Sequence, residues 1–162
     1  MNPPRSQLPG RRSIMELHTG YPAFRALIAT RGDHLVGFGY GFTGRLGQWW
    51  HDVVQSALRV EYGERLADGW LAAPFEVGEL HVHPDHQGAG LGRSLITGLC
   101  AEREERSVLL STQDAETRAR RLYRSLGFTD LLTGYRFPGG GEPYAVMGAE
   151  LPLNPHPARP PT

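Results

Sequence analysis

The alternation of apolar and polar positions predicts an ordered series of strands and helices. Apolar runs from Phe24 to Thr30 and from Leu35 to Phe42, separated by a turn at Gly32-Asp33, predict a β-hairpin. Farther along the chain, runs with a strand pattern alternate with segments whose apolar residues recur at helical spacing. Strands are expected at 75–82, 107–112, 128–137 and 144–151, and helices at 92–105 and 116–126. We therefore expect an α/β fold, with a mixed sheet of about six strands and helices on both faces.

The two ends of the chain have a composition typical of disordered segments. Residues 1–13, with several Pro residues and paired Arg residues, are expected to form a disordered leader, and a short helix is expected at 14–19. Residues 152–162 are rich in proline and are expected to form a disordered tail. The folded domain is therefore predicted to span residues 14–151.

Residues 44–73 form an insert before the central strand at 75–82. Apolar residues at helical spacing predict two helices within it. Trp49 and Trp50 lie at the start of the first helix. They either pack the insert on the sheet or form an aromatic wall of a substrate site, and the sequence leaves both interpretations open.

The segment 79–93 combines the end of a strand, a glycine-rich loop and the start of a helix. Pro84 ends the strand, and Gly88, Gly90 and Gly92 follow it. Glycine lets the backbone approach a ligand closely, and a helix N-terminus offers free N–H donors and the positive end of the helix dipole. These features favour a bound phosphate or pyrophosphate group.

The order of residues in this loop excludes two common nucleotide sites. No Gly-Lys-Ser/Thr follows the glycines, which excludes a P-loop, and their spacing does not give the Gly-x-Gly-x-x-Gly of a Rossmann fingerprint. The loop instead reads Gln-x-x-Gly-x-Gly from Gln87 to Gly92, preceded by Leu-x-Val-x-Pro at 80–84. This arrangement resembles the pyrophosphate loop and fourth strand of the GNAT (Gcn5-related) N-acetyltransferases, which bind acetyl-CoA there.

A second segment carries the same resemblance. Residues 119–128 read Ala-Arg-Arg-Leu-Tyr-Arg-Ser-Leu-Gly-Phe, similar to the family signature Ala-x-x-Leu-Tyr-x-x-x-Gly-Phe. In the family this Tyr commonly lies near the CoA sulfur, which implies that Tyr123 protonates the leaving thiolate. A phenol of pKa ~10 can donate a proton to a nascent thiolate of pKa ~8.5–10. The alternative is that Tyr123 only packs on the sheet. Glu116 stands where the family often has Asn, and we expect it to cap the helix or to favour its dipole.

The resemblance implies an acyltransferase with a mostly antiparallel central sheet. Such an enzyme moves the acetyl group of acetyl-CoA, its co-substrate, directly to an amine of a small molecule or peptide, and no metal is expected. A β-bulge on the strand at 75–82 would open room for the pantetheine arm, and the loop N–H groups would bind the pyrophosphate. The cofactor-binding residues implied are Leu80, His81, Val82, Gln87, Gly88, Ala89, Gly90, Leu91, Gly92 and Arg93.

The central strand also carries the candidates for a general base, which is needed if the amine arrives protonated. Glu79 is the first candidate and His81 the second. Strict alternation along the strand places Glu79 and His81 on one face and Glu76 on the other. The alternative for both candidates is a solvated or hydrogen-bonded strand face. Direct attack by the amine needs no nucleophilic side chain, in agreement with the lack of a convincing Cys-His or Ser-His pair.

Two other functions are compatible with these residues. The first is a non-catalytic CoA-binding or regulatory module, because the part of the chain before the hairpin is short for the family. There the family has a first strand and one or two helices. Either the first strand is absent, or the start codon is assigned too late, or a partner supplies the missing edge, and a homodimer is compatible with the last. The second function is a metal-binding domain that uses His81, His83 and His86.

Composition narrows the expected partners and location. The net charge is zero, which gives no support for a nucleic-acid partner or an acidic membrane and does not identify the acceptor. The single cysteine, Cys100, excludes an internal disulfide and suits a reducing cytoplasm. No apolar run approaches the ~20 residues of a membrane span. All 17 basic residues are arginine, as in GC-rich genomes, and we expect a cytoplasmic bacterial protein.

Overall fold

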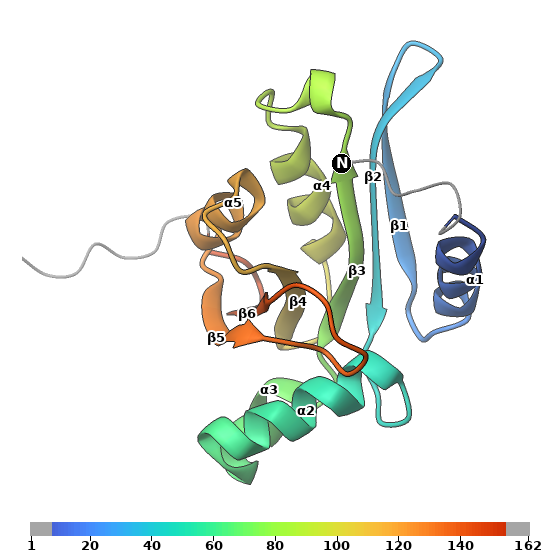
Figure 1. Ribbon diagram of the computed structural model, residues 1–162. Helices are drawn as coiled ribbons and strands as arrows, with labels where there is room; N and C mark the ends of the chain where they lie inside the picture. Colours follow the sequence, from blue (N-terminus) through green and yellow to red (C-terminus); the bar gives the residue numbers. More distant parts are fainter. Residues whose placement is uncertain (1–7, 155–162) are drawn as a thin grey trace, which may run out of the picture.

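The computed structural model of the protein describes residues 8–154, which form one mixed sheet with helices on both faces (Figure 1). The six strands have the order β1-β2-β3-β4-β6-β5, and only β3 and β4 are parallel neighbours, which confirms the expected α/β class. The strands are β1 (Arg25–Arg31), β2 (His34–Thr43), β3 (Phe75–Val82), β4 (Ser107–Gln113), β5 (Thr129–Tyr135) and β6 (Tyr144–Glu150). The α-helices are α1 (Leu8–Thr19), α2 (Trp49–Tyr62), α3 (Glu64–Leu71), α4 (Leu91–Cys100) and α5 (Arg118–Ser125).

Strand β2 alternates glycine with aromatic residues, and the two sets face opposite sides of the sheet. A Cβ added at Gly39 would lie 2.8 Å from Leu80 and 3.1 Å from Leu99 of α4, so α4 can pack this closely only on glycine. The aromatic residues face the other way, where the rings of Tyr40 and Phe42 contact His18 of α1. We call these two sides the α4 face and the α2 face of the sheet.

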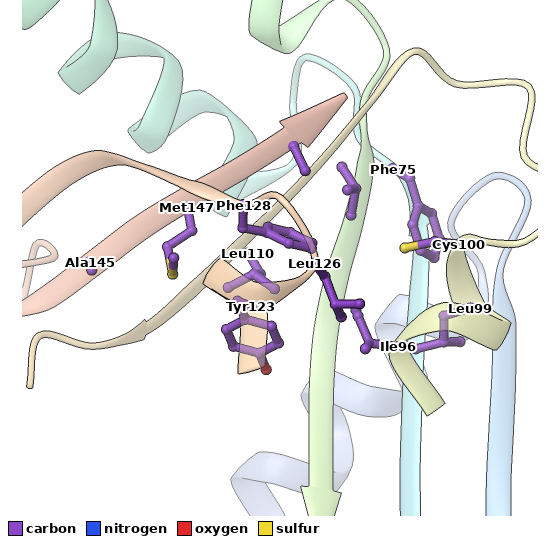
Figure 2. Close-up of a cluster of buried hydrophobic side chains, with 12 residues drawn as sticks. Phe75, Ile96, Leu99, Cys100, Leu110, Tyr123, Leu126, Phe128, Ala145 and Met147 are labelled. Carbon is purple, nitrogen blue, oxygen red and sulfur yellow. The ribbon is translucent and has the colours of Figure 1, made fainter. Parts of the chain in front are cut away.

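Each face carries its own hydrophobic core. On the α4 face, α4 and α5 cover a cluster that holds Tyr123 and Cys100 (Figure 2). On the α2 face, α2 and α3 of the predicted insert cover a second cluster. The buried members of the first cluster are Phe75, Ile96, Leu99, Cys100, Val108, Leu110, Tyr123, Leu126, Phe128, Ala145, Met147 and Ala149. Those of the second are Val54, Leu58, Ala67, Leu71, Leu109, Leu131 and Val146.

A buried polar pair joins the insert to the central strand. His51 Nδ1 of α2 lies 2.7 Å from Glu76 Oε1 of β3, and both side chains are buried. Burial raises the pKa of Glu76, and the hydrogen bond with His51 opposes that change. Because an unpaired buried carboxylate is strongly unfavourable, this bond fixes the position of α2 relative to β3.

Three element boundaries differ from the sequence prediction. The first helix begins at Leu8 and not near Ile14, so residues 8–13 belong to α1; the rest of the predicted leader lies outside the described residues. The helix α4 ends at Cys100 and not at 105, because Ala101 is extended and Glu102 has a positive φ of 53°. The cap of α5 is Thr117, whose side chain accepts a hydrogen bond from the Arg120 N–H, and not Glu116. Of the predicted tail, residues 155–162 also lie outside the described part.

The sheet has an open edge at β1. Among residues 8–154, β1 pairs with β2 alone, and its other edge has no strand partner. The described residues also contain no helix that is long and apolar enough to cross a membrane.

Candidate functional site

The parallel strands β3 and β4 separate soon after they begin. Within the described residues they pair at only two positions, Phe75 with Val108 and Glu76 with Leu109. Beyond these positions β4 continues to pair with β6, and β3 with β2. The facing edges of β3 and β4 therefore carry backbone N–H and C=O groups without a strand partner across the sheet, and such groups can pair with an extended ligand.

A β-bulge at Gly78 lies where this separation begins. Tyr40 of β2 is opposite Glu79, but the next residue, Gly41, is opposite Val77, so Gly78 is an extra residue of β3. This confirms the predicted bulge on the strand.

The bulge also corrects the predicted orientation of the acidic residues. Val77 packs with the α4-face cluster before the bulge, and Leu80 does so after it. Glu76, which binds His51 of α2, therefore shares the α2 face with Glu79 and His81. The prediction that Glu76 lies on the opposite face from Glu79 was wrong, because it counted Gly78 as an ordinary residue of the ladder.

Tyr40 and His18 hold the bulge from the α2 face. A Cβ added at Gly78 would lie 2.5 Å from the Tyr40 ring, and the Tyr40 hydroxyl lies 2.9 Å from His18 Nδ1 of α1. Burial, and next the charge of Glu79, raise the pKa of Tyr40 to about 12. Burial lowers the pKa of His18, against the effect of Glu79. At neutral pH the phenol therefore donates to a neutral imidazole. No sequence signal identified these residues, since the register of β2 against β3 is needed to bring them to Glu79.

The two candidate bases form one hydrogen-bonded pair. His81 Nε2 contacts Glu79 Oε2, and the His81 ring lies 5.2 Å from the Phe38 ring. The His81 side chain is half-exposed and that of Glu79 is one-third exposed. The structure thus brings together the first and second candidates from the sequence, next to the bulge and accessible to solvent.

The glycine loop ends at the N-terminus of α4. Gly88 and Gly90 have positive φ values of 83° and 84°, so other residues would strain the loop. Gln87 Nε2 donates to the carbonyl oxygen of Val82 at 3.0 Å and ties the loop to the end of β3. The N–H groups of the first turn of α4, which begins at Leu91, have no carbonyl acceptor within the helix. Loop and helix end thus have the geometry for which the sequence predicts anion binding, and the binding itself stays a prediction.

Two arginine side chains flank this loop. Arg118, the first residue of α5, brings its Nη1 atom to 3.1 Å from where a Cβ of Gly88 would lie. Arg93, in the first turn of α4, donates to Ser125 Oγ of α5 at 2.8 Å. The loop sequence predicts a role for Arg93 but not for Arg118, because only the packing of α5 beside the loop brings Arg118 there.

Tyr123 lies in the α4-face cluster on α5. It is buried, its ring is 5.5 Å from that of Phe128, and burial raises its pKa to about 12. Figure 2 shows its hydroxyl pointing away from Leu110 and Phe128, at the margin of the cluster. The side chain therefore packs on the sheet and also remains protonated at neutral pH, as a general acid must.

An ion-pair network fixes α5 and with it Tyr123. Arg120 contacts Asp114 and Asp130, and Arg124 contacts Asp130 and Glu116. The guanidinium groups lower the pKa of Asp130, whereas burial alone would raise it. Glu116 thus stabilises the helix through Arg124.

The histidines and the cysteine do not form a metal site among residues 8–154, where no group of three or more His, Cys, Asp or Glu side chains could hold an ion. His81 binds Glu79, whereas His83 and His86 contact each other with ring centroids 5.7 Å apart. Burial raises the pKa of Cys100 to about 12, so it remains a thiol in the core.

Comparisons with known proteins agree on one family. The family model described as "Acetyltransferase (GNAT) domain" matches residues 22–130. A GCN5-like protein acetyltransferase of Mycobacterium tuberculosis is 45% identical over 123 residues, which make up 74% of this chain and 60% of that protein. The chain thus spans about three fifths of the length of this curated relative.

Solved acetyltransferase structures share the fold. One is a putative acetyltransferase from Salmonella typhimurium with its cofactor acetyl-CoA, with a TM-score of 0.59 and 21% identity; the match covers 92% of this chain and 76% of that one. Another is a ribosomal-protein-alanine N-acetyltransferase from Brucella melitensis, with a TM-score of 0.57, 21% identity and coverage of 89% and 78%. At these identities the similarity establishes the fold.

The bulge gives a prediction about stability. Gly78→Ala should destabilise the protein by about 1–3 kcal/mol, because the new methyl group displaces the Tyr40 ring and weakens its bond with His18. Thermal unfolding measures this change. The control is Gly69→Ala in α3, where a Cβ meets nothing within 4 Å, so the substitution should leave stability unchanged or slightly higher. Equal melting temperatures of Gly78→Ala and wild type would contradict the assigned bulge.

Proposed function

Because the chain belongs to the GNAT acetyltransferase family, we propose that it transfers the acetyl group of acetyl-CoA directly to an amine of a small molecule or peptide. The observation that carries this proposal is the separation of β3 from β4 at the Gly78 bulge, with the glycine loop at the end of β3. The unpaired strand edges can pair with an extended ligand, and the N-terminal end of α4 beside them can bind an anion.

Acetyl-CoA is the proposed co-substrate. Its pantetheine amides would pair with backbone groups of Leu80 and Val82, next to His81, on the edge of β3 that faces β4. Its pyrophosphate would accept hydrogen bonds from the loop N–H groups between Gln87 and Arg93, including those of Gly88, Ala89, Gly90, Leu91 and Gly92. The Salmonella structure contains acetyl-CoA, which supports this assignment for a protein of the same fold. The flanking guanidinium of Arg118 adds a positive charge for the phosphates.

The proposed reaction needs one base and one acid. Glu79, paired with His81, takes a proton from the incoming ammonium group, and the neutral amine then attacks the thioester carbonyl carbon. The C–N bond forms, the C–S bond breaks, and Tyr123 protonates the thiolate. Burial that raises the pKa of Tyr123 to about 12 also raises that of a thiol formed beside it, so the proton transfer remains feasible.

The class of the acceptor is proposed from the description of a relative. The curated mycobacterial relative is described as a protein acetyltransferase, which favours an amine on a polypeptide. A nucleic-acid partner, a membrane partner and a metal ion are not part of the proposal, and a cytoplasmic location remains the expectation from the sequence. Binding of acetyl-CoA without turnover of any amine would support the alternative, a non-catalytic CoA-binding module.

Arg118 gives a prediction for binding of the co-substrate. Arg118→Ala should weaken CoA binding about 10-fold, because a hydrogen bond from a cation to phosphate is lost, and the loss should shrink at high salt. Calorimetric titration of CoA measures it. The matched control is Arg121→Ala on the same helix as Arg118, whose guanidinium donates to the Glu116 carbonyl just before that helix and which should leave CoA binding unchanged. Equal losses in the two variants would show that only the general charge of α5 matters.

Tyr123 gives a prediction for turnover. Tyr123→Phe should lower kcat about 100-fold and leave the Kd of acetyl-CoA unchanged, because the variant lacks the proton donor and keeps the packed ring. Thiol release measures kcat, and Tyr62→Phe, which removes a hydroxyl bound to the Leu131 carbonyl, is the control. A Tyr123→Phe variant with wild-type kcat would exclude the acid role.

A further inference from the structure

One side chain of α1 enters the protein. Every α1 side chain that the structure describes is exposed except His18, which is half-buried. The His18 ring lies 5.7 Å from the Tyr40 ring and 4.9 Å from the Phe42 ring, and its Nδ1 atom lies 2.9 Å from the Tyr40 hydroxyl oxygen. The helix therefore meets the sheet through a polar, titratable group, although an apolar side chain would be enough for packing.

Tyr40 connects His18 with the proposed base. It is directly opposite Glu79 in the antiparallel ladder, so the two side chains share the α2 face with their Cβ atoms about 5 Å apart. The charge of Glu79 acts on both other groups, since it helps to raise the pKa of Tyr40 and opposes the lowering of the pKa of His18. Tyr40 is only 2% exposed, so its hydroxyl needs a hydrogen-bond partner inside the protein.

The Tyr40 hydroxyl has one proton, and the group that accepts this proton affects Glu79. When His18 is neutral, the proton goes to Nδ1, and the side-chain partner of Glu79 is His81. A phenol proton donated to Glu79 instead would favour the carboxylate form, which would then take a proton from an ammonium group less readily. The acceptor of the Tyr40 proton thus decides how strong a base Glu79 is.

Resting on the proposed function, we propose that His18 is a positioning residue for the base, because it accepts the Tyr40 proton and keeps the phenol from donating to Glu79. Protonation of His18 reverses this hydrogen bond. Nδ1–H then donates to the Tyr40 oxygen, and the phenol proton becomes free for Glu79. The imidazolium also adds a positive charge near the carboxylate, which weakens the base further. Acid therefore slows acetyl transfer through α1.

The surroundings of His18 determine where this change occurs on the pH scale. In residues 8–154 the titratable and charged groups near it are Tyr21, Tyr40, the Glu79–His81 pair and, on α1 itself, the Arg12–Glu16 pair. Burial lowers the pKa of His18, and the charge of Glu79 opposes this change. His18 is therefore neutral at pH 7 and gains a proton only below the ordinary histidine pKa of about 6.5.

The kinetic test uses His18→Leu, which keeps the bulk of the side chain and removes the hydrogen-bond acceptor. Thiol release is followed at saturating acetyl-CoA with two amine probes, a Gly/Ser peptide that carries a free α-amine and one lysine, and spermidine. With the better probe, His18→Leu should lower kcat about 10-fold at pH 7.5 and leave the Kd of acetyl-CoA unchanged. Leu17→Ala, at a 59% exposed position of the same helix, is the matched control and should leave kcat unchanged.

A second substitution separates this role from packing. In His18→Leu the Tyr40 hydroxyl donates to Glu79, so removing that hydroxyl as well should restore the base. The double variant His18→Leu/Tyr40→Phe should therefore regain a kcat within about 2-fold of wild type. If His18 only packs α1 on the sheet, the second substitution restores nothing. A double variant no faster than His18→Leu would overturn the proposal.

His18→Asn tests the response to acid. Its amide oxygen can accept the Tyr40 proton near the position of Nδ1, and the amide does not titrate. The ratio of kcat for His18→Asn to kcat for wild type cancels the pH dependence that the two proteins share. This ratio should be about 1 at pH 7.5 and should rise at least about 3-fold by pH 5. A constant ratio over this range would contradict the proposal.

The hydrogen bond itself can be observed without any amine. Two-dimensional ¹H–¹⁵N NMR distinguishes the two ring nitrogens of each histidine, and the signals that are missing in His18→Asn identify those of His18. The proposal predicts a proton on Nε2 and none on Nδ1 at pH 7.5. A proton on Nδ1 at this pH would overturn it, because the Tyr40 proton would then already be free for Glu79.

The same measurements separate this proposal from the proposed function. Turnover by the wild type without the expected pattern in the His18 variants overturns the positioning role alone. A wild-type protein that binds no acetyl-CoA, or that binds it and acetylates neither amine probe, overturns the acetyltransferase proposal and the positioning role with it.

Discussion

The early separation of β3 from β4 is the constraint on which the rest of the structure depends. Parallel neighbours normally continue to pair along their length, whereas these two share only the positions of Phe75 and Glu76. The bulge at Gly78 turns β3 at this point, and the Tyr40 ring, bonded to His18, fills the space beside it. Two residues before the bulge, the buried Glu76–His51 pair holds the helical insert. Among the described residues, β3 and β4 do not pair beyond Glu76, which leaves their facing edges open in the middle of the sheet.

The two faces of the sheet have different roles in the proposed reaction. On the α4 face, the glycine stripe of β2 lets α4 pack close to the sheet, and α4 in turn presents the glycine loop at its N-terminus. The ion pairs around Arg120 hold α5, so Arg118 reaches the loop and Tyr123 reaches the margin of the core. On the α2 face lie Glu79 and His81. In the proposed reaction, the co-substrate and the acceptor approach from opposite faces and meet between the separated strands.

The sequence predicts much of this arrangement, and the residues it misses share one physical cause. The order of strands and helices, the glycine loop and the helix of Tyr123 depend on local patterns, which periodicity and glycine spacing reveal. The orientation of Glu76 was predicted wrongly because a bulge is defined by the partner strand, and nothing local distinguishes Gly78 from an ordinary strand glycine. Arg118 and the His18–Tyr40 pair reach the site only through packing between elements that are distant in the chain. The early end of α4 depends on a left-handed Glu102, a conformation that its residue type does not suggest.

The most direct test of the account is calorimetric titration of acetyl-CoA into the wild type and two variants of Ala89. This loop residue is exposed and is not among the positive-φ positions, so a side chain there adds no backbone strain. Ala89→Glu places a negative charge where the pyrophosphate is proposed to bind, and Ala89→Gln has the same size without the charge. We expect micromolar binding by the wild type and Ala89→Gln, and a Kd at least about 10-fold higher for Ala89→Glu. No binding by the wild type, or equal binding by both variants, would contradict the assignment of the glycine loop as the CoA site.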